Sequence, residues 1–135
     1  MSAKILIADD EPNVRLVLKA ALETDGHTVL VAHDGRNALD LVARERPDLL
    51  LLDLNMPVMD GHAVLARLRE RADPDDPVVL VLTAHATIAA AVDATRLGAA
   101  DFLQKPITPE PLRKAVNDAL ALRRVRRMQT QTIDT

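Results

Sequence analysis

The sequence predicts an α/β fold in which five strands alternate with five helices, a (βα)5 doubly wound parallel sheet. Short apolar runs of strand length occur five times, a segment with helical periodicity follows each run, and Gly or Pro residues stand at the boundaries. Regular alternation of this kind within one domain implies parallel strands, right-handed crossovers and helices on both faces of the sheet.

The five apolar runs are the expected strands. They are Lys4–Ala8, His27–Ala32, Asp48–Leu52, Val78–Leu82 and Ala100–Leu103. The third and fourth runs do not alternate with polar residues, which is typical of strands that are covered on both faces of a parallel sheet. We therefore expect these two strands at the centre of the sheet.

Helices are expected after each strand. They span Pro12–Thr24, Arg36–Arg44, His62–Arg71, Thr87–Leu97 and Pro109 to about Arg127. In the first helix, Leu16, Leu18 and Leu22 mark the expected buried face. In the loop before the third helix, Gly61 is expected to adopt a backbone conformation that other residues resist.

Composition narrows the class of protein. A chain of 135 residues with 48% hydrophobic and 27% charged residues fits one globular domain. The net charge of -3 gives no global positive field that would favour nucleic acid or an anionic membrane. The chain has no Cys, and no apolar run approaches the length of a membrane span. We therefore expect a cytoplasmic protein that is neither exported nor embedded.

Charged and hydroxyl residues follow the expected strands, where ligands gather in such sheets. They are Asp9, Asp10 and Glu11 after the first strand, Asp53 after the third, Thr83 after the fourth and Lys105 after the fifth. Two carboxylates about 5 Å apart repel by roughly 3 kcal/mol at an effective dielectric constant near 20, so the cluster needs a cation or a proton. Oxygen ligands suit Mg²⁺, and the ammonium and hydroxyl groups complete a site suited to phosphoryl transfer.

Four strings of residues carry a family resemblance: KILIADDEPNVR, LLLLDLNMPVMDG, VVLVLTAHA and ADFLQKP. In this order and at this spacing they are similar to the receiver domain of two-component response regulators. The resemblance covers about Lys4 to Leu122 and implies a flavodoxin-like strand order, 2-1-3-4-5. It also implies a receiver domain over residues 1–122, followed by a basic helical extension or linker over residues 123–135.

The resemblance assigns roles to individual residues. Asp53 would accept a phosphoryl group from the phosphohistidine of a sensor histidine kinase or phosphotransfer protein. Asp10, Asp53 and the backbone carbonyl of Asn55 would bind Mg²⁺ directly, and Asp9 would act through water. Thr83 and Lys105 would hold the phosphoryl oxygens, with a cis peptide bond between Lys105 and Pro106.

The resemblance also implies a switch. Once Asp53 is phosphorylated, Thr83 would move toward the phosphoryl group and Phe102 would turn inward, which would change the face made by the fourth helix, fifth strand and fifth helix. That face would control a homodimer or an output partner. Asn55 and His85 would tune dephosphorylation. The domain would catalyse only its own phosphorylation and slow autodephosphorylation, so it is not expected to be an enzyme in the usual sense.

The C-terminal part leaves the output open. The stretch from Thr83 to Pro106 resembles receivers fused to ATP-dependent transcription activators, so an output domain could follow outside this sequence. A free-standing single-domain regulator is the alternative. The cluster of Arg residues between positions 123 and 127 complements the helix dipole, and no direct binding of nucleic acid is expected because no aromatic residues interleave it.

Three other functions fit parts of the pattern. A phosphohydrolase of the haloacid-dehalogenase type would need a DxDxT motif at the first strand, but Asp9 and Asp10 are adjacent. A flavodoxin-like small-ligand protein would need a phosphate loop rich in Gly and hydroxyl residues after that strand, but the sequence there is DDEPN. A receiver that acts without phosphorylation is disfavoured by the complete acidic set.

Overall fold

Apolar residues on both faces of the central strands require helices on both sides of the sheet, and the fold meets that requirement. The computed structural model describes residues 2–71, 73–84 and 88–133. The strands are β1 (Lys4–Ala8), β2 (Thr28–Ala32), β3 (Leu49–Asp53), β4 (Val78–Thr83) and β5 (Asp101–Gln104). The helices are α1 (Pro12–Thr24), α2 (Gly35–Glu45), α3 (Gly61–Arg71), α4 (Ile88–Arg96) and α5 (Pro109–Ile133).

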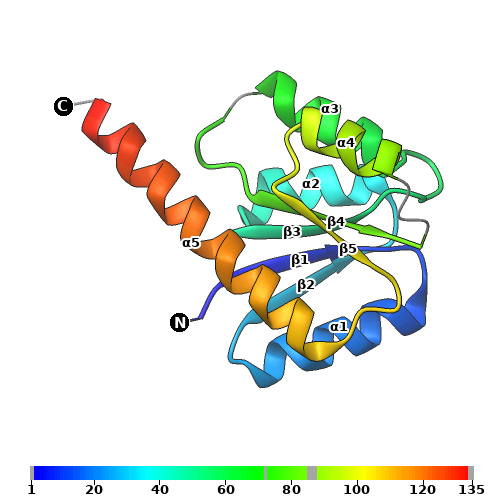
Figure 1. Cartoon of the computed structure of the whole chain (residues 1–135). Helices are drawn as coiled ribbons and strands as arrows, with labels where there is room; N and C mark the ends of the chain where they lie inside the picture. The colour runs from blue at the N-terminus through cyan, green and yellow to red at the C-terminus, as the bar shows by residue number, and fades with distance from the viewer. Residues whose placement is uncertain (1, 72, 85–87, 134–135) are drawn as a thin grey trace.

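All neighbouring strands are parallel, and their order is β2-β1-β3-β4-β5 (Figure 1). The predicted fold class and strand order are therefore confirmed. Each strand boundary lies within one residue of its prediction. In β1, β3 and β4 the apolar runs are also the residues buried between the two helical layers, whereas the edge strands β2 and β5 are partly exposed.

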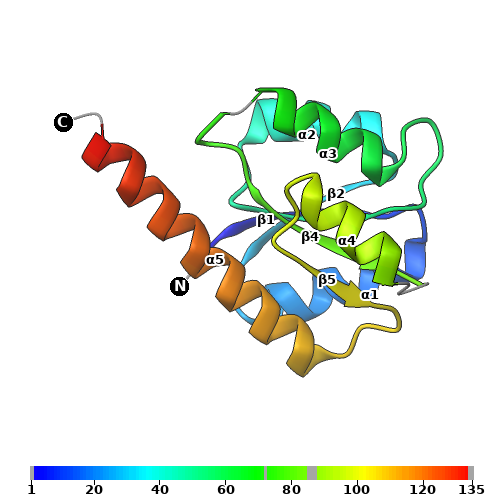
Figure 2. The same ribbon diagram turned by 45° about the horizontal axis from the view of Figure 1, so that its top comes forward.

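Side chains of each strand alternate between two cores. Ile5, Ile7, Leu49 and Leu51 pack with α1 and α5 on one face of the sheet. The residues between them pack with α2, α3 and α4 on the other face. Figure 2 shows these two helical layers with the sheet between them.

The outer face of α1 differs from the prediction. Leu18 and Leu22 are buried as expected, but Leu16 and its neighbour Val17 are 68% and 59% exposed. The reason is helical geometry: Leu18 and Leu22 are four residues apart and share a face, whereas residues two apart do not. Assigning Leu16 to the buried face was wrong, and α1 presents an apolar pair to solvent.

Helix α5 continues to Ile133, six residues beyond the predicted end. Arg123 is 8% exposed, and its guanidinium donates hydrogen bonds to Asp48 Oδ1 (3.0 Å) and to the Asp75 carbonyl oxygen (3.1 Å). The expected boundary between residues 122 and 123 thus falls inside one continuous helix, and Arg123 packs on the domain. None of the described helices, α5 included, combines the length and apolar character needed to cross a membrane.

Candidate functional site

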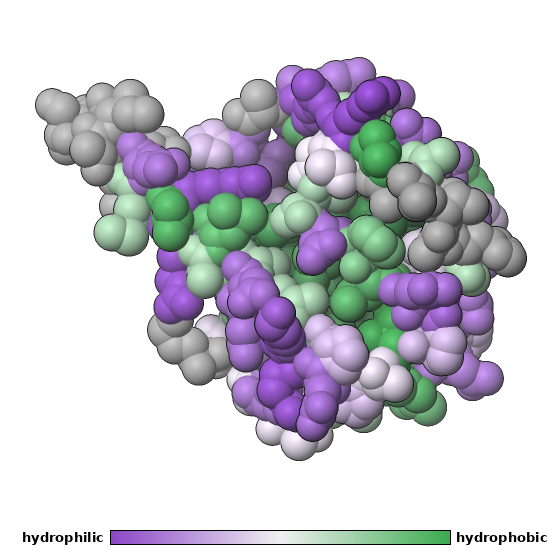
Figure 3. Space-filling view, in the orientation of Figure 1, coloured by the Kyte–Doolittle hydropathy of each residue, from purple (hydrophilic) through white to green (hydrophobic). Residues whose placement is uncertain are grey.

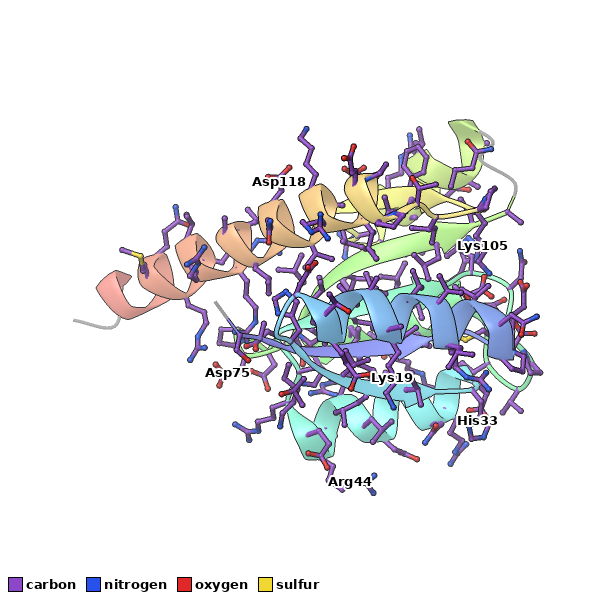
Figure 4. All side chains as sticks on the ribbon, turned by 90° about the horizontal axis from the view of Figure 1, so that it is seen from below. Lys19, His33, Arg44, Asp75, Lys105 and Asp118 are labelled. Carbon is purple, nitrogen blue, oxygen red and sulfur yellow. The ribbon has the colours of Figure 1, made fainter. Side chains whose placement is uncertain are left out.

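The register of the strands brings the predicted site residues together at one end of the sheet. Ala8 pairs with Leu52 across β1 and β3, so the residues that follow each, Asp9 and Asp53, come side by side. The Lys105 backbone N–H donates a 2.8 Å hydrogen bond to the Thr83 carbonyl oxygen, which ties the end of β5 to the end of β4. Figure 4 shows Lys105 at this end of the sheet and Asp75 at the opposite end.

Four carboxylates make up the acidic part of the site. Asp9, Asp10, Glu11 and Asp53 each offer an oxygen within 4.8 Å of the others. Asp9 and Asp53 are buried, whereas Asp10 and Glu11 lie at the rim and are exposed. The cluster therefore has a buried floor and a solvent-accessible mouth.

Lys105 supplies the positive charge. Its Nζ lies 2.8 Å from Asp9 Oδ2, 3.0 Å from Glu11 Oε1 and 3.4 Å from Asp53 Oδ2. The Lys105 side chain is only 11% exposed, so these contacts lie in a medium that screens charge less than bulk water does. One ammonium against four carboxylates still leaves the site with an excess of negative charge.

Burial and the neighbouring charges shift the pKa values of both Asp53 and Lys105. Burial raises the pKa of Asp53 to about 6, and the charge of Asp9 adds to the rise. The Asn55 N–H, which donates a 3.0 Å hydrogen bond to Asp53 Oδ1, and the Lys105 ammonium oppose it. Burial by itself would lower the pKa of Lys105, but the contacts with Asp9 and Glu11 outweigh burial and raise it. Lys105 is therefore a permanent cation, while Asp53 is the group that can take up a proton near neutral pH.

The donor set fits a hard divalent cation. All the candidate ligands are oxygens, which Mg²⁺ prefers, and the two exposed carboxylates leave room for ligands from solvent. Asp9 Oδ2 is buried and has no hydrogen-bond partner of good geometry, although the Lys105 ammonium is close. A second cation would neutralise this oxygen and remove the repulsion between Asp9 and Asp53.

The loop after β3 packs closely against the site. The Gly61 N–H donates a 3.1 Å hydrogen bond to the Leu54 carbonyl oxygen, and a Cβ at Gly61 would lie 2.5 Å from the Asp53 carbonyl oxygen. The prediction that Gly61 needs a special backbone conformation was wrong, because the described glycines with positive φ are Gly26 and Gly98. Gly61 matters because the backbone of Asp53 leaves no space for a side chain.

The remaining predicted residues fall near the site in different environments. Thr83 ends β4 and is 5% exposed, Asn55 is exposed in the loop after β3, and Phe102 in β5 is 38% exposed. The predicted cis peptide bond between Lys105 and Pro106 is present. His85 lies outside the described residues. The roles assigned to these side chains stay predictions.

Two contacts were not anticipated from the sequence. The Glu11 carboxylate, at the end of the first strand, pairs with Lys105. The Arg15 guanidinium donates a 2.7 Å hydrogen bond to the Asp9 carbonyl oxygen. The spacing of these two residues, four apart at the start of a helix, was the available signal, since it places both on the face of the helix nearest the strand end.

Comparison with known proteins identifies relatives along most of the chain. The family model for the response regulator receiver domain matches residues 5–117. The "Response regulator MprA" of Mycobacterium bovis (strain BCG / Pasteur 1173P2) is 44% identical over 112 residues, covering 83% of this chain and 48% of the relative. The "Probable transcriptional regulator ycf27" of Porphyridium aerugineum is 38% identical over 117 residues, covering 87% of this chain and 48% of the relative. The chain thus spans about half the length of these curated relatives.

Solved structures agree with the sequence relatives. NtrX from Brucella abortus matches with a TM-score of 0.89 and 30% identity, covering 98% of this chain and 30% of that one. The chemotaxis protein CheY4 of Vibrio cholerae matches with a TM-score of 0.81 and 31% identity, covering 88% of this chain and 99% of that one. The similarity therefore extends both to a part of a longer regulator and to a protein of about one domain.

Proposed function

The chain belongs to the response regulator receiver domain family, and on that premise we propose that it is a switch controlled by phosphorylation of Asp53. The observation that carries the proposal is the position of the Asp53 carboxylate, in a cluster of four acids and 3.4 Å from the Lys105 ammonium. Asp53 lies at the end of a buried strand, where a carboxylate is costly unless it has a partner or a task.

In the proposed reaction, an Asp53 carboxylate oxygen attacks the phosphorus atom of a phosphohistidine. The new P–O bond forms as the P–N bond breaks, and the imidazole leaves with the electron pair of that bond and takes up a proton. Lys105 and the Thr83 hydroxyl would donate hydrogen bonds to the phosphoryl oxygens, so that the charge developed during transfer meets fixed donors. The domain would be the acceptor of a phosphoryl group rather than an enzyme with its own substrate.

Asp9, Asp10, Asp53 and the Asn55 carbonyl are the residues that would hold Mg²⁺ in this proposal. When bound, Mg²⁺ would neutralise the carboxylates and polarise the phosphoryl group. The fit rests on the oxygen donors within 4.8 Å of one another and on the excess negative charge described above.

A groove beside the site supports a docking place for the histidine kinase or phosphotransfer protein. The groove lies between α1 and the segment after β5, and it includes Val17, Lys105 and Ile107. Lys105 belongs both to this groove and to the acidic site, so a donor docked there would reach Asp53. The exposed apolar pair at Leu16 and Val17 suits an amphipathic helix of the donor.

The face made by α4, β5 and α5 supports a homodimer or an output partner. The exposed large apolar residues on these three elements include Val92 in α4, Phe102 in β5, and Leu122, Val125 and Met128 in α5. Figure 3, in the orientation of Figure 1, shows apolar residues at the centre of this face with polar residues around them. Phe102 lies at the surface, and an inward turn of its ring on phosphorylation would change the shape of this face.

The output of the switch is a second part of the proposal. The relatives are about twice as long as the matched region, and one of them is named a probable transcriptional regulator. On this basis α5 would continue toward a C-terminal output domain. Arg123 packs on the domain, and the basic residues after it would then form a linker.

The other functions considered have less support. The family match covers the strand ends that carry the site, and it favours a receiver over a haloacid-dehalogenase-type phosphohydrolase or a flavodoxin-like ligand-binding protein. A receiver that works without phosphorylation would have the same fold, but its Asp53 would not accept a phosphoryl group. Labelling with a phosphoryl donor therefore separates the two.

Incubation of the protein with a small acyl phosphate and Mg²⁺ tests the proposal. The intact mass should increase by one phosphoryl group, and both Asp53→Asn and removal of the metal with a chelator should abolish the increase. Asp60→Asn is the matched control, because Asp60 is an exposed acid at the same end of the sheet whose Oδ1 accepts the Ala63 N–H. An unchanged mass of the wild-type protein would overturn phosphorylation as the trigger.

A further inference from the structure

Glu11 directly precedes α1, and its side chain contacts the acidic site. It is the N-cap of α1, yet its side chain accepts no capping hydrogen bond from the helix. The carboxylate instead accepts a 3.0 Å hydrogen bond from Lys105, which is 94 residues away in the sequence. Ser, Thr, Asp and Asn are the usual capping residues, and their short side chains bond to the N–H groups of the first turn. The longer Glu11 side chain reaches Lys105 instead.

The backbone holds Glu11 beside the site. Its N–H donates a 2.9 Å hydrogen bond to Asp9 Oδ1, one of the buried carboxylates. The side chain, in contrast, is 58% exposed, so it can leave Lys105 for solvent at little cost. Of the three carboxylates around Lys105, Glu11 is the one that can be exchanged, because Asp9 and Asp53 are buried.

The ammonium of Lys105 has three N–H donors. In this structure it donates hydrogen bonds to Glu11 Oε1 and Asp53 Oδ2, and it lies 2.8 Å from Asp9 Oδ2 as an ion pair. A phosphoryl group on Asp53 would bring new oxygens that need one of these donors. Its negative charge would also repel the Glu11 carboxylate. Phosphorylation and the contact between Glu11 and Lys105 therefore compete for the same ammonium.

We propose that Glu11 is a positioning residue that holds Lys105 in the unphosphorylated domain and must release it when Asp53 is phosphorylated. Glu11 thus opposes acceptance of the phosphoryl group and sets how readily the domain is modified. This inference deepens the proposed function and rests on it.

Two substitutions separate the contact from the charge. Glu11→Gln removes the charge, and Glu11→Asp keeps the charge but is one methylene shorter and loses contact with Lys105. Both should be phosphorylated faster by an acyl phosphate, by about two- to five-fold for Glu11→Gln, the range expected for loss of an exposed ion pair. Asp60→Asn, which removes a rim charge that does not touch Lys105, should react at the wild-type rate.

A second readout is independent of phosphorylation. Lys105 is one of four lysines, so the NMR signal of its ammonium can be assigned in the metal-free protein by substitution. This signal should shift in Glu11→Gln and in Glu11→Asp but not in Asp60→Asn. An unchanged Lys105 signal in both Glu11 variants would overturn the inference.

The rates give further ways to contradict it. Suppose that Glu11→Asp is phosphorylated at the wild-type rate while Glu11→Gln and Asp60→Asn are both phosphorylated faster. The rate would then depend on the negative charge around the site and not on the contact between Glu11 and Lys105. An unlabelled wild-type protein would overturn the proposed function and the regulatory role with it. The Lys105 signal would still report whether Glu11 holds Lys105, so the two failures are distinguishable.

Discussion

Asp53 is held where burial opposes its ionisation, and this has a measurable effect on stability. The pKa of its carboxyl is about 6 in the folded domain, compared with 3.8 for the free side chain. Because the folded value is the higher one, protonated Asp53 stabilises the metal-free fold at low pH. This contribution is complete below about pH 4 and is lost as the pH rises through about 6.

The first prediction compares the wild-type protein with Asp53→Asn in the presence of a chelator. The Asn variant cannot ionise, so it should be more stable at pH 7.5, by about 1–3 kcal/mol. The difference should shrink as the pH falls toward 5. Urea unfolding across this range measures it, and a difference that is independent of pH would contradict the assignment of the raised pKa to Asp53.

At the scale of residues, the sequence predicted the site best for charged residues that directly follow a strand. Asp9, Asp53 and Lys105 were predicted to converge because each follows a strand, and they do. The pairing of Glu11 with Lys105 was missed because the strand pattern says which end of the sheet a side chain occupies but not which neighbour it contacts. The importance of Gly61 was foreseen for the wrong reason, since close approach to Asp53 depends on how a loop packs.

At the scale of elements, α5 is anchored by Arg123 at the end of the sheet opposite the acidic site. Its guanidinium bonds Asp48 and the loop at Asp75, while Asp48 Oδ2 accepts a 2.9 Å hydrogen bond from the Lys4 N–H. The anchor therefore joins the start of β1, the residue before β3 and the long last helix.

Replacing Arg123 by Met should lower the free energy of unfolding by about 1–3 kcal/mol, because buried hydrogen bonds to a charged group are lost. Hydrogen exchange in the part of α5 beyond residue 123 should become faster. Lys114→Met, an exposed change on the same helix, is the control and should alter stability by less than about 0.5 kcal/mol. Equal urea midpoints for the two variants would show that Arg123 does not anchor the helix.

The strands were predicted more accurately than the helices. A strand buried on both faces is visible as an unbroken apolar run, as in Leu49–Leu52. The end of α5 was placed too early. Arg123 and Arg127 of this helix contact Asp75, which is distant in the sequence, and local periodicity carries no information about such contacts. Leu16 shows a second limit of periodicity: an apolar residue within a helix can be exposed to solvent rather than buried in the core.

At the scale of the whole molecule, the acidic site and the anchor of α5 lie at opposite ends of the sheet. The carboxyl ends of the strands carry the acidic site, and the opposite end carries the anchor of α5 (Figure 4). Strand β5 connects the site to the face with α4, because Phe102 lies in the strand that ends just before Lys105.

Phe102→Ala should leave the rate of labelling close to that of the wild type, because the Phe102 ring carries no group that could bind the metal or donate to the phosphoryl oxygens. The gain in self-association on phosphorylation should weaken by about tenfold, because without the ring the face made by α4, β5 and α5 would no longer change shape when Asp53 is modified. Sedimentation with and without phosphorylation measures this, with Val31→Ala on the opposite edge strand as the control. Loss of labelling itself would show that Phe102 supports the pocket instead.

The central claim is that Asp53, among the neighbouring acids, receives the phosphoryl group. Borohydride reduces an aspartyl phosphate to an alcohol and so leaves a permanent mark on the modified residue, which peptide mass spectrometry can locate. After treatment with acyl phosphate and Mg²⁺, the account predicts homoserine at position 53 and unmodified Asp9, Asp10 and Glu11. A mark on any of those three residues, or no mark at position 53, would contradict it.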